Sequence, residues 1–156
     1  SQPLRDYRDT VDEPSRIKQM VFGHFSRCLY PQQKFDSDTE RRFAVILERD
    51  ADKWFKPTKG QFQLFYKLGV EQPEYVPDFV VETPHHLLMC ETKARNELGA
   101  DDVKAKAEAG ALWCKHASDH ARTTGAKPWK YLLIAHDAVT EDKRLADYLQ
   151  FAVAPS

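Results

Sequence analysis

The segment YVPDFVVETPHHLLMCETK, residues 75–93, is the most informative part of this sequence for predicting the fold. Two apolar runs, FVV and LLMC, flank the polar connection ETPHH, and this pattern is typical of two short strands joined by a turn. Asp78 stands at the head of the first run, whereas Glu91 and Lys93 close the second. The segment therefore places three charges at the ends of strands that are otherwise apolar.

Alternation along the strands predicts where these charges point. Successive side chains of a strand face opposite sides, so Met89, Glu91 and Lys93 share one face. Asp78 takes the same face as Val80 in the preceding strand. Because the two strands are expected to pair, Asp78 and Glu91 converge at one edge of the sheet.

Converging carboxylates need a compensating charge. Two carboxylates about 4 Å apart repel by roughly 4 kcal/mol at an effective dielectric constant of about 20. A shared proton, Lys93 or a divalent metal offsets this repulsion, and Mg²⁺ favours carboxylates, waters and substrate phosphates. Asp, Glu and Lys at one strand end suit phosphodiester hydrolysis, in which a metal activates water and an ammonium stabilises charge. The residues alone leave a second interpretation open: a surface ion pair of Glu91 with Lys93, and Asp78 in a strand-entry turn.

The rest of the chain predicts an α/β domain with a central mixed sheet flanked by helices. The first helix is expected at 14–29, as an extra N-terminal helix. A second opens at Ser37, which forms a capping box with Glu40. The expected elements are helices at 14–29, 36–50, 101–117 and 141–151, and strands at 53–55, 61–68, 79–82, 87–93 and 129–135.

Composition limits the class of protein. The chain has 156 residues, 42% hydrophobic and 30% charged, which suits one domain with a real core. Residues 1–13 are expected to be a linker or arm, and the first residue, Ser1, suggests a piece of a longer protein. No apolar run approaches the roughly 18 residues of a membrane span. The three cysteines include no CxxC pair, so a zinc ribbon or disulfide framework is not indicated and a reducing cell interior is expected.

Pro77-Asp78 followed by Glu91-Thr92-Lys93 resembles the signature of the PD-(D/E)XK nuclease superfamily. Its restriction-endonuclease-like core runs helix, three strands, helix, strand, with PD on one strand and ExK on the next. Over roughly residues 15–136 the chain resembles the C-terminal nuclease domain of type III restriction endonucleases and similar helicase–nucleases. The stretches that carry this likeness are FDSDTERRFAVILERDADKWFKPTKGQFQLFY, YVPDFVVE, CETKARNEL, DVKAKAEAGALWC and KPWKYLLI.

The resemblance implies that residues 14–156 form an endonuclease domain that cuts double-stranded DNA with Mg²⁺, for which Mn²⁺ substitutes. It assigns Asp78 and Glu91 as metal ligands, Lys93 as the catalytic lysine and Glu40 as an auxiliary metal ligand. It also implies a helicase or translocase in the same full-length chain, a methyltransferase subunit as partner, and a bacterial or archaeal cytoplasm. The chain contains no GxxxxGK[ST], so no ATP site is expected in it.

Several supporting residues have two interpretations. Glu40 lies on the inward arc of its helix, where it either binds metal or folds back onto the backbone of Ser37. Lys106 either reaches the site or a DNA phosphate, or lays its stem over Trp113. The remaining candidate phosphate contacts also fit a merely solvated surface: Arg41, Arg42, Lys56, Lys59, Lys67, Arg95 and Lys104.

Two alternatives to the enzyme remain. The first is a catalytically inert DNA- or protein-binding module on the same fold. The second is a structural adaptor without a bound cation. His116 and His120 are one helical turn apart, but no third ligand stands out, so they are expected to be surface histidines.

Overall fold

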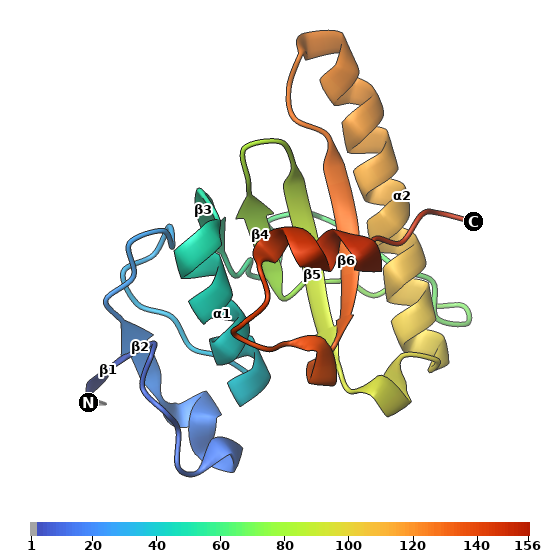
Figure 1. The fold of residues 1–156 in the computed structure, drawn as a ribbon. Helices are drawn as coiled ribbons and strands as arrows, with labels where there is room; N and C mark the ends of the chain where they lie inside the picture. The colour runs from blue at the N-terminus through green and yellow to red at the C-terminus, as the bar shows by residue number, and fades with distance from the viewer. Residues whose placement is uncertain (1–2) are drawn as a thin grey trace.

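The structure is a computed structural model that describes residues 3–156. Two helices and a four-stranded sheet form its centre, and short 3₁₀ segments connect them (Figure 1). The elements in chain order are β1 (Leu4–Asp6), η1 (Pro14–Gln19), β2 (Val21–Gly23), α1 (Asp38–Asp50), β3 (Lys53–Phe55), β4 (Phe79–Glu82), β5 (Leu87–Lys93), η2 (Arg95–Glu97), α2 (Asp101–Thr124), β6 (Trp129–Ala135), η3 (His136–Ala138) and η4 (Leu145–Phe151).

The predicted mixed sheet is confirmed. Its strand order is β3-β4-β5-β6, with antiparallel pairs between β3, β4 and β5 and a parallel pair between β5 and β6. The connection at residues 83–86 closes the predicted hairpin, where the N–H of Thr83 donates to the carbonyl of His86 at 2.9 Å. Phe79 pairs with Cys90, so the register extended by one residue sets Asp78 opposite Glu91.

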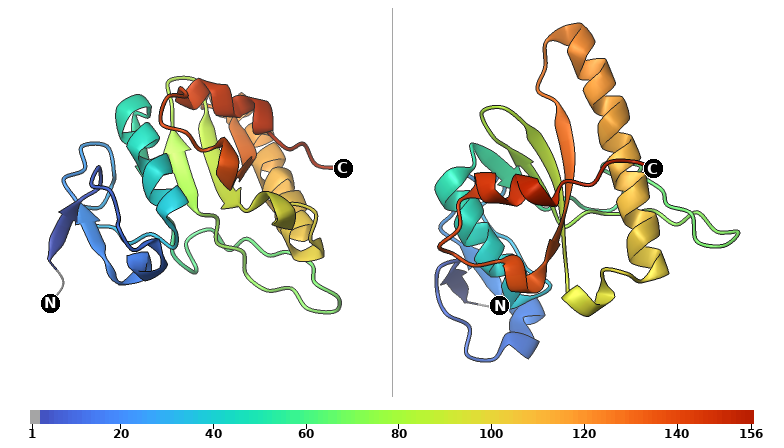
Figure 2. Two further views of the ribbon diagram at one scale, coloured as in Figure 1. Left: turned by 60° about the horizontal axis from the view of Figure 1, so that its bottom comes forward. Right: turned by 45° about the vertical axis from the view of Figure 1, so that its right-hand side comes forward.

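The two faces of the sheet are covered by different elements. One core cluster joins α1 and η4 to the sheet and contains Leu88 and Cys90 of β5. The other joins α2 to the opposite face and contains Met89 of β5 and Tyr131 of β6. Figure 1 and the second view of Figure 2 show α2 and η4 on different sides of the sheet. The alternation predicted for β5 therefore holds across both layers.

Helix α1 begins at the N-cap that the sequence predicts, but only one of the two hydrogen bonds of the predicted capping box forms. Ser37 is its N-cap, and the Ser37 hydroxyl accepts a hydrogen bond from the N–H of Glu40 at 3.2 Å. Near the other end of α1, the buried carboxylate of Glu48 accepts four hydrogen bonds. Their donors are the backbone N–H groups of Ser26, Arg27 and Cys28 and the indole Nε1 of Trp54, at 2.6–3.0 Å.

The predicted helix at 14–29 is wrong. Only the 3₁₀ turn η1 forms there, and the chain then enters β2, which pairs in parallel with β1. His24 has a positive φ of 69°, which a helix does not allow. The N–H groups at 26–28 find their acceptor in Glu48, so a helical turn is not needed to satisfy them. Residues 4–6 lie in β1 and Val11 is buried, while the link to a preceding domain stays a prediction.

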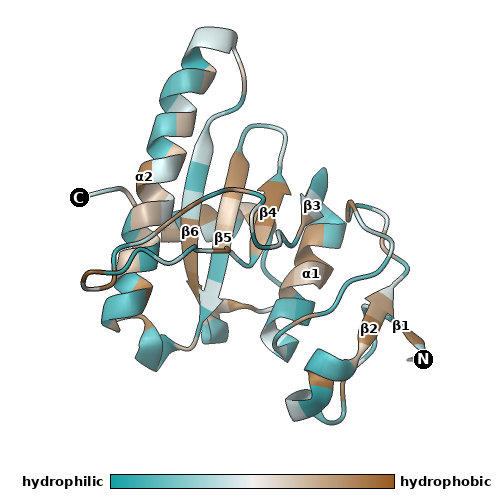
Figure 3. Cartoon of the chain, turned by 180° about the vertical axis from the view of Figure 1, so that it is seen from behind, coloured by the Kyte–Doolittle hydropathy of each residue, from teal (hydrophilic) through white to brown (hydrophobic). Residues whose placement is uncertain are grey.

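The predicted strand at 61–68 is also wrong. Residues 57–77 form an irregular segment, here called the arm, with only the isolated bridges Phe65–Glu74 and Leu68–Glu71. Positive φ angles at Gly60, Gln63 and Gly69 break the extended pattern. The arm crosses the α2 side of the sheet and extends past α2, as Figures 2 and 3 show. Its apolar residues Phe62, Leu64 and Tyr66 pack on that face.

Helix α2 runs further than the sequence predicts, from Asp101 to Thr124, and ends at Gly125 in the left-handed conformation. Gly110 allows α2 to lie close to β6, because an added Cβ would stand 2.4 Å from a ring carbon of Tyr131. Trp113 and Trp129, both half-buried, meet edge to face at 4.7 Å between ring centroids and pack against the core cluster on this side of the sheet. Figure 3 shows hydrophilic residues along the outer side of this helix.

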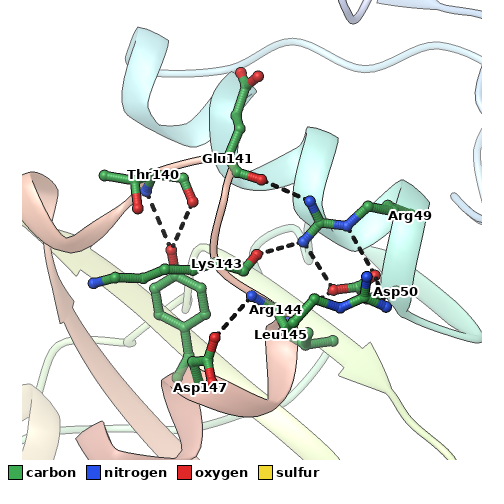
Figure 4. Close-up of polar contacts among 9 residues, drawn as sticks. Arg49, Asp50, Thr140, Glu141, Lys143, Arg144, Leu145 and Asp147 are labelled. Atoms are coloured by element: carbon green, nitrogen blue, oxygen red, sulfur yellow. Dashed lines mark hydrogen bonds and ion pairs between the residues drawn. The ribbon is translucent and has the colours of Figure 1, made fainter.

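The predicted C-terminal helix at 141–151 is reduced to the 3₁₀ segment η4, Leu145–Phe151. Its approach is fixed by two residues at the end of α1 (Figure 4). Arg49 donates to the carbonyls of Glu141 and Lys143, and Asp50 accepts from the N–H of Leu145 at 2.9 Å. None of the helices within residues 3–156 is long and apolar enough to cross a membrane.

Candidate active site at the strand ends

Asp78 is held against β5 by Thr92, the residue between Glu91 and Lys93. Its Oδ2 accepts hydrogen bonds from the backbone N–H of Thr92 at 2.9 Å and from the Thr92 hydroxyl at 3.1 Å. No hydrogen bond to Oδ1 is found within residues 3–156. Asp78 therefore enters the sheet edge with one oxygen fixed and the other available to a ligand.

Glu91 is buried, with 6% of its surface exposed. Its Oε1 accepts a hydrogen bond from the hydroxyl of Tyr75 at 2.7 Å, and that hydroxyl lies 2.6 Å from the hydroxyl of Tyr131. Its Oε2 lies 4.0 Å from the ammonium of Lys93. The carboxylate is thus oriented by the arm on one side and faces Lys93 on the other.

The charges of this site affect one another. Burial is the main cause that raises the pKa of Glu91 to about 8, and the nearby Asp78 carboxylate contributes in the same direction. The Tyr75 hydrogen bond and the charges of Lys93 and Lys106 oppose this rise without cancelling it. The repulsion expected from the sequence between Asp78 and Glu91 is therefore present, and a proton on Glu91 relieves it near neutral pH.

Glu40 lies inward from α1, with 4% of its surface exposed. Its Oε1 accepts from the N–H of Asp36 at 3.0 Å and lies 2.8 Å from the ammonium of Lys56. The carboxylate therefore does not fold back onto the backbone of Ser37, which corrects that interpretation. Burial raises the pKa of Glu40, and Asp78 adds to the rise while Lys56 opposes it.

Three acidic residues approach one another beside α1. One carboxylate oxygen each of Asp36, Glu40 and Asp78 lies within 4.8 Å of the other two. This acidic group is the only one of its kind in the described chain, and Glu91 is outside it. Lys56 lies against the group, because its Nζ also donates to the carbonyl of Asp78 at 3.0 Å.

The lysines and arginines predicted to contact phosphate have different surroundings in the structure. Lys106 places its Nζ 5.4 Å from the ring centroid of Tyr66 on the arm. Lys104 is exposed, whereas Arg95 pairs with Asp137 at 2.7 Å. Arg41 and Arg42 donate to the backbone carbonyls of Tyr7 and Val139, and their role as phosphate contacts stays a prediction.

Sequence reasoning missed the residues that hold the carboxylates in place. Tyr75 and Thr92 each stand within three positions of an acid of the site, which is the only signal in the sequence. Tyr131 and Asp36 gave none, because their contacts depend on how α2, the arm and α1 pack. His116 and His120 are exposed, as expected.

The donor set fits a hard divalent cation. Carboxylate oxygens are the ligands that Mg²⁺ and Mn²⁺ prefer, and adjacent strands present two such groups here. Asp78 and Glu91 each keep one oxygen without a hydrogen-bond donor among the described residues.

Comparisons of the chain with protein-family models, curated proteins and solved structures find no significant match.

Proposed function

We propose that the chain is a metal-dependent endonuclease domain that hydrolyses phosphodiester bonds of double-stranded DNA. The observation that carries the proposal is the position of Asp78 opposite Glu91 at the ends of adjacent strands, where Asp78 raises the pKa of Glu91, with Lys93 4.0 Å from Glu91. The raised pKa of Glu91 supports it, because a site that strains its own carboxylates gains from binding a cation.

Asp78 Oδ1 and Glu91 Oε2 are the oxygens that would hold Mg²⁺ or Mn²⁺. The ion supplies a lowered pKa of a coordinated water and neutralisation of phosphate charge. Tyr75 and Thr92 occupy the other oxygen of each carboxylate, so they limit each acid to one direction of ligation. Such outer contacts fix ligand orientation.

Lys93 is the residue that would hold the attacking water or the scissile phosphate. It extends the face of Met89 and Glu91 beyond the core, where a DNA strand has access, and its side chain is 27% exposed. An ammonium there stabilises negative charge that develops on the phosphate. Lys104 and Lys106 on α2 would contact neighbouring phosphates.

The order of elements also supports the proposal. From α1 to β6 the chain runs helix, three strands, helix, strand, and this is the order that the resemblance to PD-(D/E)XK nucleases implies. On that resemblance we place the domain in a bacterial or archaeal cytoplasm. It would follow a helicase or translocase in the full-length chain and work with a methyltransferase subunit.

The test is cleavage of supercoiled plasmid in Mg²⁺ or Mn²⁺ by the wild type and by Asp78→Asn and Lys93→Ala. We expect nicking by the wild type and a loss of roughly a hundredfold or more in the variants. Lys130→Ala, which changes an exposed lysine of β6, is the control and should cleave normally. Metal-dependent nicking that survives in both site variants, with circular dichroism showing native folds, would refute the assignment.

An inert DNA- or protein-binding module is the second candidate. One observation favours it: a proton on Glu91 and the ammonium of Lys56 compensate the acids without any divalent ion. Calorimetric titration with Mn²⁺ separates the candidates. Binding that disappears in Asp78→Asn supports the nuclease, and the absence of binding by the wild type supports the module.

A further inference from the structure

Lys56 occupies a position that a second cation would need. It follows β3 directly, and its side chain is 12% exposed. Its Nζ lies 2.8 Å from Glu40 Oε1, 3.0 Å from the carbonyl oxygen of Asp78 and 4.5 Å from the centroid of the Phe79 ring. Carboxylate, carbonyl and aromatic face together surround the ammonium with negative potential.

This ammonium is the main compensating charge of the acidic group. Asp36, Glu40 and Asp78 bring their oxygens within 4.8 Å of one another, and within residues 3–156 only Lys56 forms an ion pair with any of the three. Glu40 is itself buried, so removing its partner would leave a charge that must be protonated or compensated by another cation. The contact is therefore much more costly to break than a surface ion pair.

We propose that Lys56 is the resident cation of the Asp36, Glu40 and Asp78 group and limits the centre to a single divalent ion. This inference rests on the proposed function, in which Asp78 and Glu91 hold that ion. The resemblance implies that Glu40 is an auxiliary metal ligand. Under this proposal Glu40 stays in its ion pair with Lys56 and does not ligate metal in the wild type. Lys56 is a residue that determines metal stoichiometry, not a phosphate contact.

The charges in this part of the site support the assignment of different cations to Glu91 and Glu40. Glu91 faces Lys93 and Tyr75 on the α2 side of the sheet, whereas Glu40 faces Lys56 beside α1. Asp78 stands between them, with its carbonyl on Lys56 and its carboxylate on Thr92. One divalent ion and one ammonium therefore satisfy the acids on both sides, and a second ion would have to displace the lysine.

The test is the number of Mn²⁺ ions bound per chain at pH 8, measured by calorimetry and by the electron paramagnetic resonance signal of free Mn²⁺. We expect about one ion for the wild type and about one more for Lys56→Met, whose side chain has a similar length without the charge. Lys56→Arg should keep the wild-type count. Lys53→Met, which removes an exposed lysine of β3, should do the same.

Two further variants connect the extra ion to Glu40. The double variant Lys56→Met/Glu40→Gln should return to the wild-type count, and Glu40→Gln alone should leave the wild-type ion bound. The second result keeps the proposal testable if Lys56→Met does not fold. A folded Lys56→Met with no additional ion, or loss of the wild-type ion in Glu40→Gln, would overturn the inference.

The outcome also distinguishes the inference from the proposed function. If the wild type binds Mn²⁺ and cleaves DNA but Lys56→Met gains no ion, the nuclease stands and the role of Lys56 fails. If the wild type binds no ion and Lys56→Met gains one, Lys56 displaces cations as proposed and the nuclease loses its metal. Because the readout is bound metal, neither conclusion depends on cleavage.

Discussion

Glu91 is a buried acid whose charged form the site disfavours. Its folded-state pKa, about 8, lies above the ordinary value of 4.5 because burial and Asp78 disfavour its charge. A raised carboxyl pKa contributes stability that is complete below the ordinary value and is lost as the pH rises through the folded value. In the metal-free protein this loss falls between pH 4.5 and about 8.

We expect Glu91→Gln to gain stability relative to the wild type as the pH rises through this window, because glutamine cannot ionise. The difference in unfolding free energy should grow by on the order of 5 kcal/mol from acid to alkaline pH. Urea unfolding at several pH values in EDTA measures it. The exposed Glu97→Gln is the control, and a difference that stays flat with pH would contradict the assignment of charge.

Tyr75 is the residue whose hydroxyl fixes the direction of Glu91. We expect Tyr75→Phe to weaken Mn²⁺ binding by roughly tenfold, since the freed carboxylate can turn away from Asp78. Mn²⁺ calorimetry measures this affinity. Tyr66→Phe on the same arm should bind Mn²⁺ as tightly as the wild type, and unchanged affinity in Tyr75→Phe would show that the contact does not position the ligand.

The packing of helix α2 on strand β6 reaches the site through Tyr131. Gly110 lies against the Tyr131 ring, and the Tyr131 hydroxyl contacts that of Tyr75. We expect Gly110→Ala to destabilise the fold by roughly 1–3 kcal/mol, because the added methyl group forces Tyr131 to move. Thermal unfolding tests this, with Gly99→Ala as the control because its Cβ meets nothing within 4 Å.

The N-terminal segment depends on one buried carboxylate of α1. Glu48 accepts from three backbone N–H groups, at Ser26, Arg27 and Cys28, and from the Trp54 indole. We expect Glu48→Ala to cost on the order of 3 kcal/mol and to speed amide exchange at 26–28 more than in α2, since these donors lose their acceptor. Hydrogen exchange by NMR measures this, and unchanged protection of the amides at 26–28 in Glu48→Ala would show that another group holds these donors. The exposed Glu13→Gln is the control.

The site lies at the edge of the sheet, between the elements that pack on its two faces. Glu40 comes from the α1 side, whereas Tyr75 and Tyr131 belong to the cluster on the α2 side. Asp78 and Glu91 stand at the ends of the central strands between them. The centre is therefore complete only when both layers have packed, and substitutions in either layer should reach it.

Most of the sheet was predictable because its signals are local. Period-two alternation and a short connection fix the register of β4 and β5, and a one-residue slip would expose their apolar faces. The arm and the N-terminal segment were not predictable. Their apolar residues also suit a strand or a helix, and positive φ angles and the distant acceptor Glu48 decide against both.

The hairpin, the mixed sheet and the position of Asp78, Glu91 and Lys93 at neighbouring strand ends follow from local pattern, because alternation and chain adjacency require nothing beyond the backbone. The groups that surround those acids depend on the packing of distant segments. Tyr75 and Tyr131 are 56 positions apart, and Lys56 reaches the carbonyl of Asp78 across 22. Contacts of that separation depend on how helices and loops pack, and no local pattern records them.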